Sequence, residues 1–163
     1  MLTNPGWLFP WLLFLHVLGA IVAFGPTFAF PILGGMGGRE REHANFATRV
    51  SLTVSRQLVV PIALTMPVTG AAMILVAGID LSARANWWLG IAIVLYAIAI
   101  TIAVANNVPA SARIVELTSA SPQPGGGPPA ELAGLRNRVV RGGMINSVLI
   151  VVIVLLMVVK PQF

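Results

Sequence analysis

The sequence predicts an all-α fold: a polytopic membrane protein built as a four-transmembrane-helix bundle, with the N and C termini outside. Of its 163 residues, 57% are hydrophobic and only 9% are charged, whereas about 25% are charged in a typical soluble domain. Four apolar runs lie at about 7–33, 58–79, 87–108 and 142–159. Each is close to the roughly 20 residues that cross a bilayer as a helix. We therefore expect residues 1–163 to form a single integral membrane domain.

Backbone hydrogen bonding predicts that these spans are helical. Lipid offers no water to backbone N–H and C=O groups, so only helices and closed barrels cross it. Strands of a membrane barrel alternate apolar and polar residues over about ten positions, and the four runs lack that alternation. The chain also contains no cysteine, which excludes disulfides and thiolate metal sites.

The basic residues predict the orientation of the bundle. The two longer connections carry eight of the ten basic residues, namely Arg39, Arg41, Arg49, Arg56, Arg113, Arg136, Arg138 and Arg141. The positive-inside rule places these connections in the cytoplasm. The four tryptophans then fall at the outer interface, which suits an amphipathic ring. Because the arginines lie beside apolar segments, they indicate contacts with membrane lipids through anionic headgroups and not with nucleic acid.

The two cytoplasmic connections differ in composition. Residues 38–57 place Phe46, Val50 and Val54 at spacings of four, which suits an amphipathic helix running along the headgroups into the second span; we favour the alternative, a solvated basic collar that only fixes topology. Residues 118–129 are rich in Pro, Gly and Ser, which predicts a flexible loop. A helix is expected to resume at Pro129 or Ala130.

A histidine in the first span is the main candidate site residue. At about 100° per residue, His16 shares a stripe with the small residues Gly19 and Ala23, and small stripes pack helices together in lipid. Helix rise puts His16 at a depth similar to that of Thr69, Met73 and Tyr96. These four residues form the candidate cofactor-binding constellation, and we expect a hydrogen bond from His16 to Thr69 or Tyr96.

Prolines and polar residues indicate further contacts inside the bundle. Pro26, Pro61 and Pro67 each free the carbonyl four residues earlier, and nearby threonines are expected to donate to those carbonyls. A second polar layer is expected nearer the cytoplasm, where hydrogen bonds between helix ends are its simplest explanation. Its members are Thr27, Gln57, Asn106, Asn107, Asn146 and Ser147, with Arg141 at the edge.

A resemblance to a known family of proteins rests on residues 14–31, FLHVLGAIVAFGPTFAFP. With its early histidine, Gly-Pro break and following arginine-rich segment, the chain resembles a family of small, uncharacterised, four-span bacterial integral membrane proteins. That family is distantly similar to the copper-resistance-D group, which includes the J-type protoporphyrinogen oxidases. The resemblance implies a multi-pass protein of the bacterial cytoplasmic (inner) membrane. In the oxidase branch a first-span histidine is associated with haem, so the resemblance implies haem as the candidate cofactor and His16 as its ligand.

Three functions are compatible with these patterns. The first is a non-enzymatic accessory or scaffold protein, in which His16 is a polar contact between helices within a homo-oligomer or larger membrane complex. The second is a haem- or metal-binding membrane protein, with Met73 or Tyr96 as a second ligand of the group on His16. The third is a small-solute transporter acting as an oligomer, although proton-coupled transport usually needs a carboxylate within the spans. No acid–base pair, nucleophile–base pair or phosphate loop indicates an enzyme, and we favour the first function.

Overall fold

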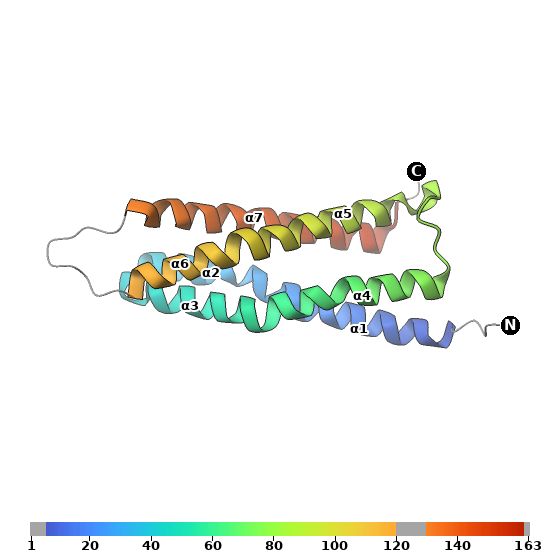
Figure 1. The fold of residues 1–163 in the computed structure, drawn as a ribbon, viewed down its shortest axis with the longest axis horizontal. Coiled ribbons are helices and arrows are strands. Elements are labelled where there is room, and N and C mark those ends of the chain that lie inside the picture. Colours follow the sequence, from blue (N-terminus) through green and yellow to red (C-terminus); the bar gives the residue numbers. More distant parts are fainter. Residues whose placement is uncertain (1–5, 120–129, 162–163) are drawn as a thin grey trace.

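A computed structural model describes residues 6–119 and 130–161 and confirms the all-α class. Four long helical rods run side by side along one axis (Figure 1), and the described residues contain no strand. Each rod is long and apolar enough to cross a membrane. The starts of α1 and α5 lie at the same end of the bundle as the ends of α4 and α7.

Each of the first three rods is a chain of consecutive helical segments. The first contains the 3-10 turn η1 (Gly6–Leu8), α1 (Phe9–Phe24), the 3-10 turn η2 (Gly25–Phe28) and α2 (Phe30–Arg39). After the short turn η3 (Arg41–His43), the second contains α3 (Ala44–Val54), the π-helical turn η4 (Ser55–Val59) and α4 (Val60–Ala77). The third contains η5 (Arg84–Asn86), α5 (Trp87–Thr101), the π-helical turn η6 (Ile102–Asn107) and α6 (Val108–Ser119). The fourth is α7 (Ala130–Val159) alone.

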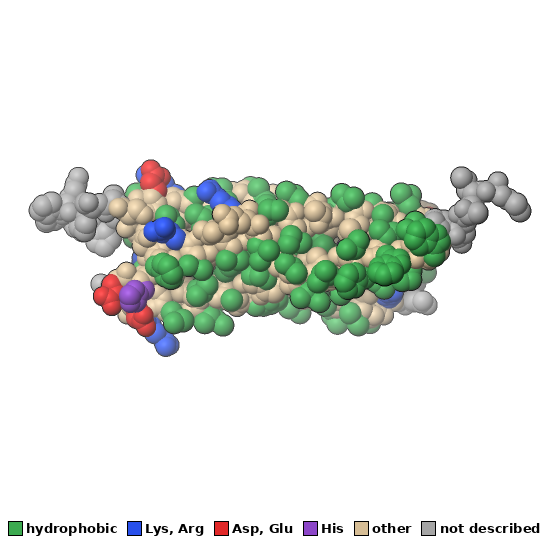
Figure 2. Space-filling model, turned by 90° about the horizontal axis from the view of Figure 1, so that it is seen from below, with side chains coloured by type: hydrophobic (Ala, Val, Ile, Leu, Met, Phe, Trp, Pro, Cys, Tyr) green, Lys and Arg blue, Asp and Glu red, His purple; other side chains and the backbone are tan. Residues whose placement is uncertain are grey.

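The rods are longer than the apolar runs predicted from the sequence. They contain 34, 34, 36 and 30 residues, which at 1.5 Å per residue gives about 45–54 Å, against a hydrocarbon core of about 30 Å. The excess lies at one end of the molecule, where most of the acidic and basic side chains in view and a histidine gather, while hydrophobic side chains cover most of the remaining length (Figure 2). The membrane-spanning bundle therefore continues past the membrane as a helical extension formed by α2, α3, α6 and the first half of α7.

This extension corrects the expectation for residues 38–57. The segment does not lie across the bundle as a headgroup helix, because α3 continues the direction of α4 and packs against α2 and α6. A Cβ on Gly37 would lie 3.1 Å from Ala44 Cα, so the α2–α3 contact needs a residue without a side chain there. The predicted loop 118–129 falls largely outside the described residues; α6 includes residues 118 and 119, and α7 begins at Ala130 as expected.

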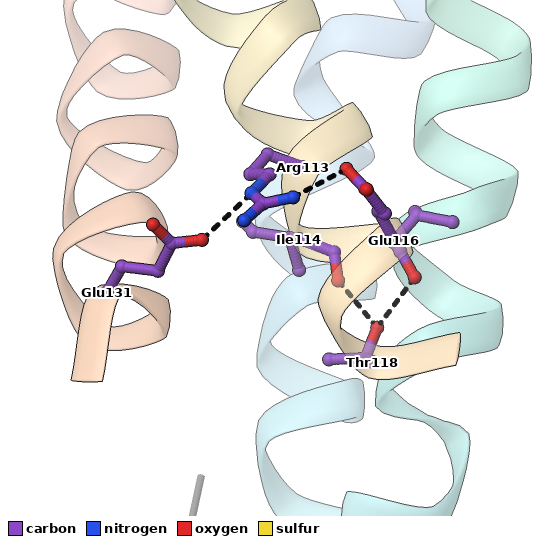
Figure 3. A network of polar contacts seen from close by, with 6 residues as sticks. Arg113, Ile114, Glu116, Thr118 and Glu131 are labelled. Carbon is purple, nitrogen blue, oxygen red and sulfur yellow. Dashed lines mark hydrogen bonds and ion pairs between the residues drawn. The ribbon is translucent and has the colours of Figure 1, made fainter. Parts of the chain in front are cut away.

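Polar contacts join the helices of the extension. The Asn45 amide of α3 donates to Thr118 Oγ1 of α6 at 2.7 Å. Arg113 of α6 lies 2.8 Å from both Glu116, on its own helix, and Glu131 of α7 (Figure 3). These ion pairs are exposed and contribute little energy individually, but the pair with Glu131 fixes the register of α6 against α7.

The α1–α4 contact confirms the predicted packing face of the first span. Ala23 has no exposed surface, and a Cβ on Gly19 would lie 2.9 Å from Met66 Sδ. Leu18, the neighbour of Gly19, is 43% exposed and faces away from the bundle. Close approach at small residues is the expected means of packing in lipid, where apolar surfaces gain little from leaving one apolar medium for another.

The opposite end of the bundle carries the tryptophans and a tight connection. α4 ends at Gly78, whose φ of 63° is a left-handed conformation that glycine adopts readily. The Asp80 carboxylate accepts hydrogen bonds from the hydroxyl and the N–H of Ser82, and these bonds lower the pKa of Asp80. Trp7, Trp11 and Trp87 are exposed as the interface prediction requires, whereas Trp88 is buried in the bundle and Lys160 lies over its ring.

Gly19→Leu is expected to destabilise the bundle by about 1–3 kcal/mol, because the added side chain would displace Met66. Gly34→Leu is the matched control, since a Cβ on Gly34 meets nothing within 4 Å and leucine favours a helix. The melting temperatures of both variants in mild detergent test this. Equal melting temperatures would contradict the assigned face.

Orientation can be tested with two cysteines placed on exposed alanines at opposite ends of the bundle. We expect Ala85→Cys to react with an impermeant thiol reagent applied to intact cells, and Ala133→Cys to react only after lysis, because the positive-inside rule places the arginine-rich end in the cytoplasm. The reverse pattern of labelling would invert the topology.

Candidate functional site

His16 and Thr69 join α1 to α4, as the sequence predicted. His16 Nδ1 lies 2.8 Å from Thr69 Oγ1, and the Thr69 hydroxyl also donates to the Met66 carbonyl at 3.0 Å. The imidazole packs over Gly70, where a Cβ would lie 3.4 Å from His16 Cε1. A glycine one residue beyond the hydrogen-bond partner therefore leaves room for the ring between the helices.

The Thr69 contacts indicate the tautomer of His16. A hydroxyl has one proton, so Thr69 can donate to Met66 only if His16 Nδ1 carries its own proton and donates to Oγ1. Nε2 is then an unprotonated acceptor. The described residues provide Nε2 with no hydrogen bond, and Nε2 is not among their fully buried unpaired atoms. Nε2 is therefore not fully enclosed by the described residues. With the proton on Nδ1, a neutral imidazole carries its lone pair on Nε2, which is the form that ligates metals.

Tyr96 lies at a different level from His16. Its hydroxyl donates to the Ala63 carbonyl, and its ring packs edge-on against Phe24 with centroids 6.4 Å apart. Ala63 precedes Thr69 by six residues and Phe24 follows His16 by eight, which corresponds to about 9–12 Å along the helices. The expectation that Tyr96 shares the depth of His16 is therefore wrong, because the Tyr96 hydroxyl meets α4 at Ala63, nearer the arginine-rich end of the bundle.

The Tyr96 contact explains how the helix tolerates Pro67. Proline has no N–H, so Pro67 leaves the Ala63 carbonyl without its helical donor, and Tyr96 supplies a donor from α5. We expected threonines to fill this role, and that was wrong. Each of the three threonines instead donates to the carbonyl three residues earlier in the same helical rod. The pairs are Thr27 with Phe24, Thr65 with Ile62 and Thr69 with Met66. One feature of the sequence pointed to this donor: Tyr96 is the sole tyrosine of the chain, and a tyrosine side chain is long enough to reach a neighbouring helix.

Met73 lies near the His16–Thr69 contact, on the same helix as Thr69. Met73 is half-buried on α4, one turn outward of Thr69, and its role as a second ligand stays a prediction. Within residues 6–119 and 130–161, no group of three or more His, Cys, Asp or Glu side chains could hold a metal ion. A group bound at His16 would therefore receive a single imidazole from each chain.

The inner polar layer is organised around Asn106 of the π-helical turn η6. The Arg138 guanidinium of α7 donates through Nε to Asn106 Oδ1, and the Asn106 amide donates to Asn107 Oδ1 at 2.9 Å. The buried Gly142 faces these two amides; a Cβ there would lie 2.7 Å from Asn106 Nδ2. The sequence analysis placed Asn106 and Asn107 in this layer but missed Arg138, because Arg138 lies before the predicted fourth span and reaches Asn106 from the continuous helix α7.

Other expected members of the layer bond locally or stay unpaired. Ser147 donates to the Gly143 carbonyl of its own helix at 3.0 Å. Asn146 Oδ1 is the one fully buried side-chain oxygen or nitrogen without a partner in the described part of the chain. Hydrogen bonding between helices therefore accounts for Asn106, which meets Arg138 of α7, whereas in the described part of the chain Asn107 bonds only to its neighbour Asn106 and Asn146 Oδ1 has no partner.

A double-mutant cycle can test the pairing of Tyr96 with Pro67. Tyr96→Phe leaves the Ala63 carbonyl without a donor and should cost about 1–2 kcal/mol, whereas in a Pro67→Ala background the restored N–H should make the same change nearly neutral. Unfolding in detergent measures both. An equal cost in the two backgrounds would mean that the hydroxyl does not replace the missing N–H.

Comparison with known proteins identifies the family. No curated protein and no solved structure matches the chain. A family model described as "Predicted integral membrane protein (DUF2269)" matches residues 10–161, which include all four spans and both polar clusters. The resemblance to a family of integral membrane proteins is thereby confirmed, and the chain belongs to the DUF2269 family of integral membrane proteins.

Proposed function

We propose that this chain is a non-enzymatic accessory or scaffold protein, a single membrane domain of the bacterial cytoplasmic membrane with both termini outside. The observation that carries the proposal is that two polar side chains of the spans hold helices together. His16 joins α1 to α4 through Thr69, and Tyr96 joins α5 to α4 through Ala63. Hydrogen bonds between membrane helices stabilise one arrangement of the bundle, which is what a scaffold requires.

The extension beyond the membrane supports the same proposal. Its helices are joined by the Asn45–Thr118 hydrogen bond and the Arg113–Glu131 ion pair, so the protein presents a helical platform to the cytoplasm. A platform of this kind suits assembly with further copies or with a larger membrane complex. The transporter alternative has no observation in its favour, since the five acidic residues all lie at the two ends of the rods.

A second candidate function, haem or metal binding, is favoured by the free Nε2 of His16. The Thr69 hydrogen bond orients the ring as second-shell partners do for ligating histidines, so these residues fit an axial imidazole ligand. Met73 or His16 of another copy would supply the second ligand, and a distant relation to the copper-resistance-D group would account for the shared histidine. When bound, haem supplies electron-transfer or oxygen chemistry. The chain itself supplies the ligand and its orientation.

One comparison of variants separates the two functions. We expect the wild type, expressed with ample haem and metals and purified in mild detergent, to show no Soret band and no stoichiometric metal. His16→Ala and Thr69→Val should each lower its stability by about 0.6–2 kcal/mol, the range of a hydrogen bond between membrane helices.

Thr65→Val is the matched control, because Thr65 bonds only to its own helix and should leave the stability nearly unchanged. A Soret band or bound metal that disappears in His16→Ala would overturn the scaffold proposal and support the second candidate. In that case Thr69→Val should weaken binding of the group about 10–100-fold.

A further inference from the structure

An open pocket lies at the inner boundary of the apolar part of the bundle. It has a volume of about 470 Å³ and lies between η6 and the first half of α7. Asn106, Asn137, Arg138 and Arg141 give it a polar side, while Ile102 and Ile145 give it an apolar side. The pocket is distinct from the His16 contact, which belongs to α1 and α4.

The two arginines of this pocket carry charge that no carboxylate of the chain neutralises. Glu116 and Glu131 both pair with Arg113, and Glu40 and Glu42 lie beside His43. The fifth acidic residue, Asp80, lies in the connection at the opposite end of the bundle. In the described part of the chain, Arg138 and Arg141 are therefore without an acidic partner.

The local structure prepares these arginines for an anion. They are three residues apart, which puts them on one face of α7, where two unpaired cations repel each other. Asn106 holds Arg138 through its Nε atom, which fixes the guanidinium and leaves its two terminal amino groups free. The Asn137 amide adds a further donor on the same wall. Fixed guanidinium and amide donors converging on one pocket are the pattern that recognises phosphate oxygens.

Depth selects the kind of molecule that carries the anion. Arg141 directly precedes 18 residues without a charge, 142–159, so the polar wall lies at the level of cytoplasmic headgroups and the isoleucine wall faces acyl chains. We propose that this pocket binds a phosphate group at Arg138, Arg141 and Asn137, and that an anionic phospholipid of the cytoplasmic leaflet presents it. Basic pockets between helices on this side of a membrane are suited to such headgroups.

The proposal can be tested by thermal unfolding in a neutral detergent. The melting temperature is measured with phosphatidylglycerol or phosphatidylcholine of the same acyl chains, and with sodium phosphate or sodium chloride at equal ionic strength. We expect phosphatidylglycerol to raise the melting temperature in a saturable way, because a ligand of the folded state stabilises that state. Arg138→Gln/Arg141→Gln should weaken the apparent affinity about tenfold or more.

Two controls separate the site from general charge and from misfolding. Arg49→Gln/Arg136→Gln removes the same charge from exposed residues outside the pocket and should keep the wild-type response. Arg141→Gln alone leaves the Asn106–Arg138 contact in place, so it should fold as the wild type does and still lose most of the response.

Each outcome bears on the proposal. A response to phosphatidylglycerol alone supports a lipid headgroup, and a comparable response to sodium phosphate shows that the phosphate group suffices without the lipid. Phosphatidylcholine carries the same phosphate group without a net charge, so equal effects of the two lipids would overturn the assignment to an anionic phospholipid. Equal losses in both double variants would overturn the site.

Discussion

Every backbone polar group inside lipid needs a partner, and Pro67 of α4 breaks that rule locally. Its missing N–H leaves the Ala63 carbonyl without a helical donor, and the Tyr96 hydroxyl restores the bond from α5. Because the donor comes from another helix, the repair also fixes the depth of α5 relative to α4. Phe24 of α1 packs against the same tyrosine ring. The contacts of Tyr96 thus connect three of the four rods, since its hydroxyl bonds to α4 and its ring packs against α1.

The two ends of the bundle are held by different physical means. Inside the membrane, packing depends on small residues such as Gly19 and Ala23, because lipid provides no strong drive to bury apolar surface. In the extension water is present, so burial of Ile114 and Leu132 contributes energy there, and exposed polar contacts such as Arg113–Glu131 set specificity. The π-helical turns η4 and η6 lie in the middle of their rods. A π-helical turn changes the direction of side chains on either side of it, and η6 turns Asn106 toward α7.

His16 shows how one contact serves both candidate functions. The hydrogen bond that joins α1 to α4 also fixes the ring orientation and the tautomer that a ligating histidine needs. The proposed anion pocket depends on a similar arrangement at the arginine-rich end of the bundle, where Asn106 accepts from Arg138 Nε and the terminal amino groups of Arg138 have no hydrogen-bond partner among the described residues. In both places a short polar side chain, Thr69 or Asn106, orients a longer side chain on a neighbouring helix. The function then depends on which ligand binds the remaining nitrogen atoms of that longer side chain.

The sequence alone determined the fold class, the four spans and the small packing face, and it placed His16 inside the bundle beside Thr69 or Tyr96, because hydrophobic length and helical periodicity are local properties of the chain. The structure decided between these two partners in favour of Thr69. It did not determine where the helices stop, since the charged stretches beyond the spans are helical only through packing against one another, as Gly37 against Ala44 illustrates. Nor did it determine the partners of Tyr96 and Arg138. A hydrogen bond between helices depends on their relative depth and rotation, and a count of residues along each span contains neither. The tertiary packing alone decided which donor meets which acceptor.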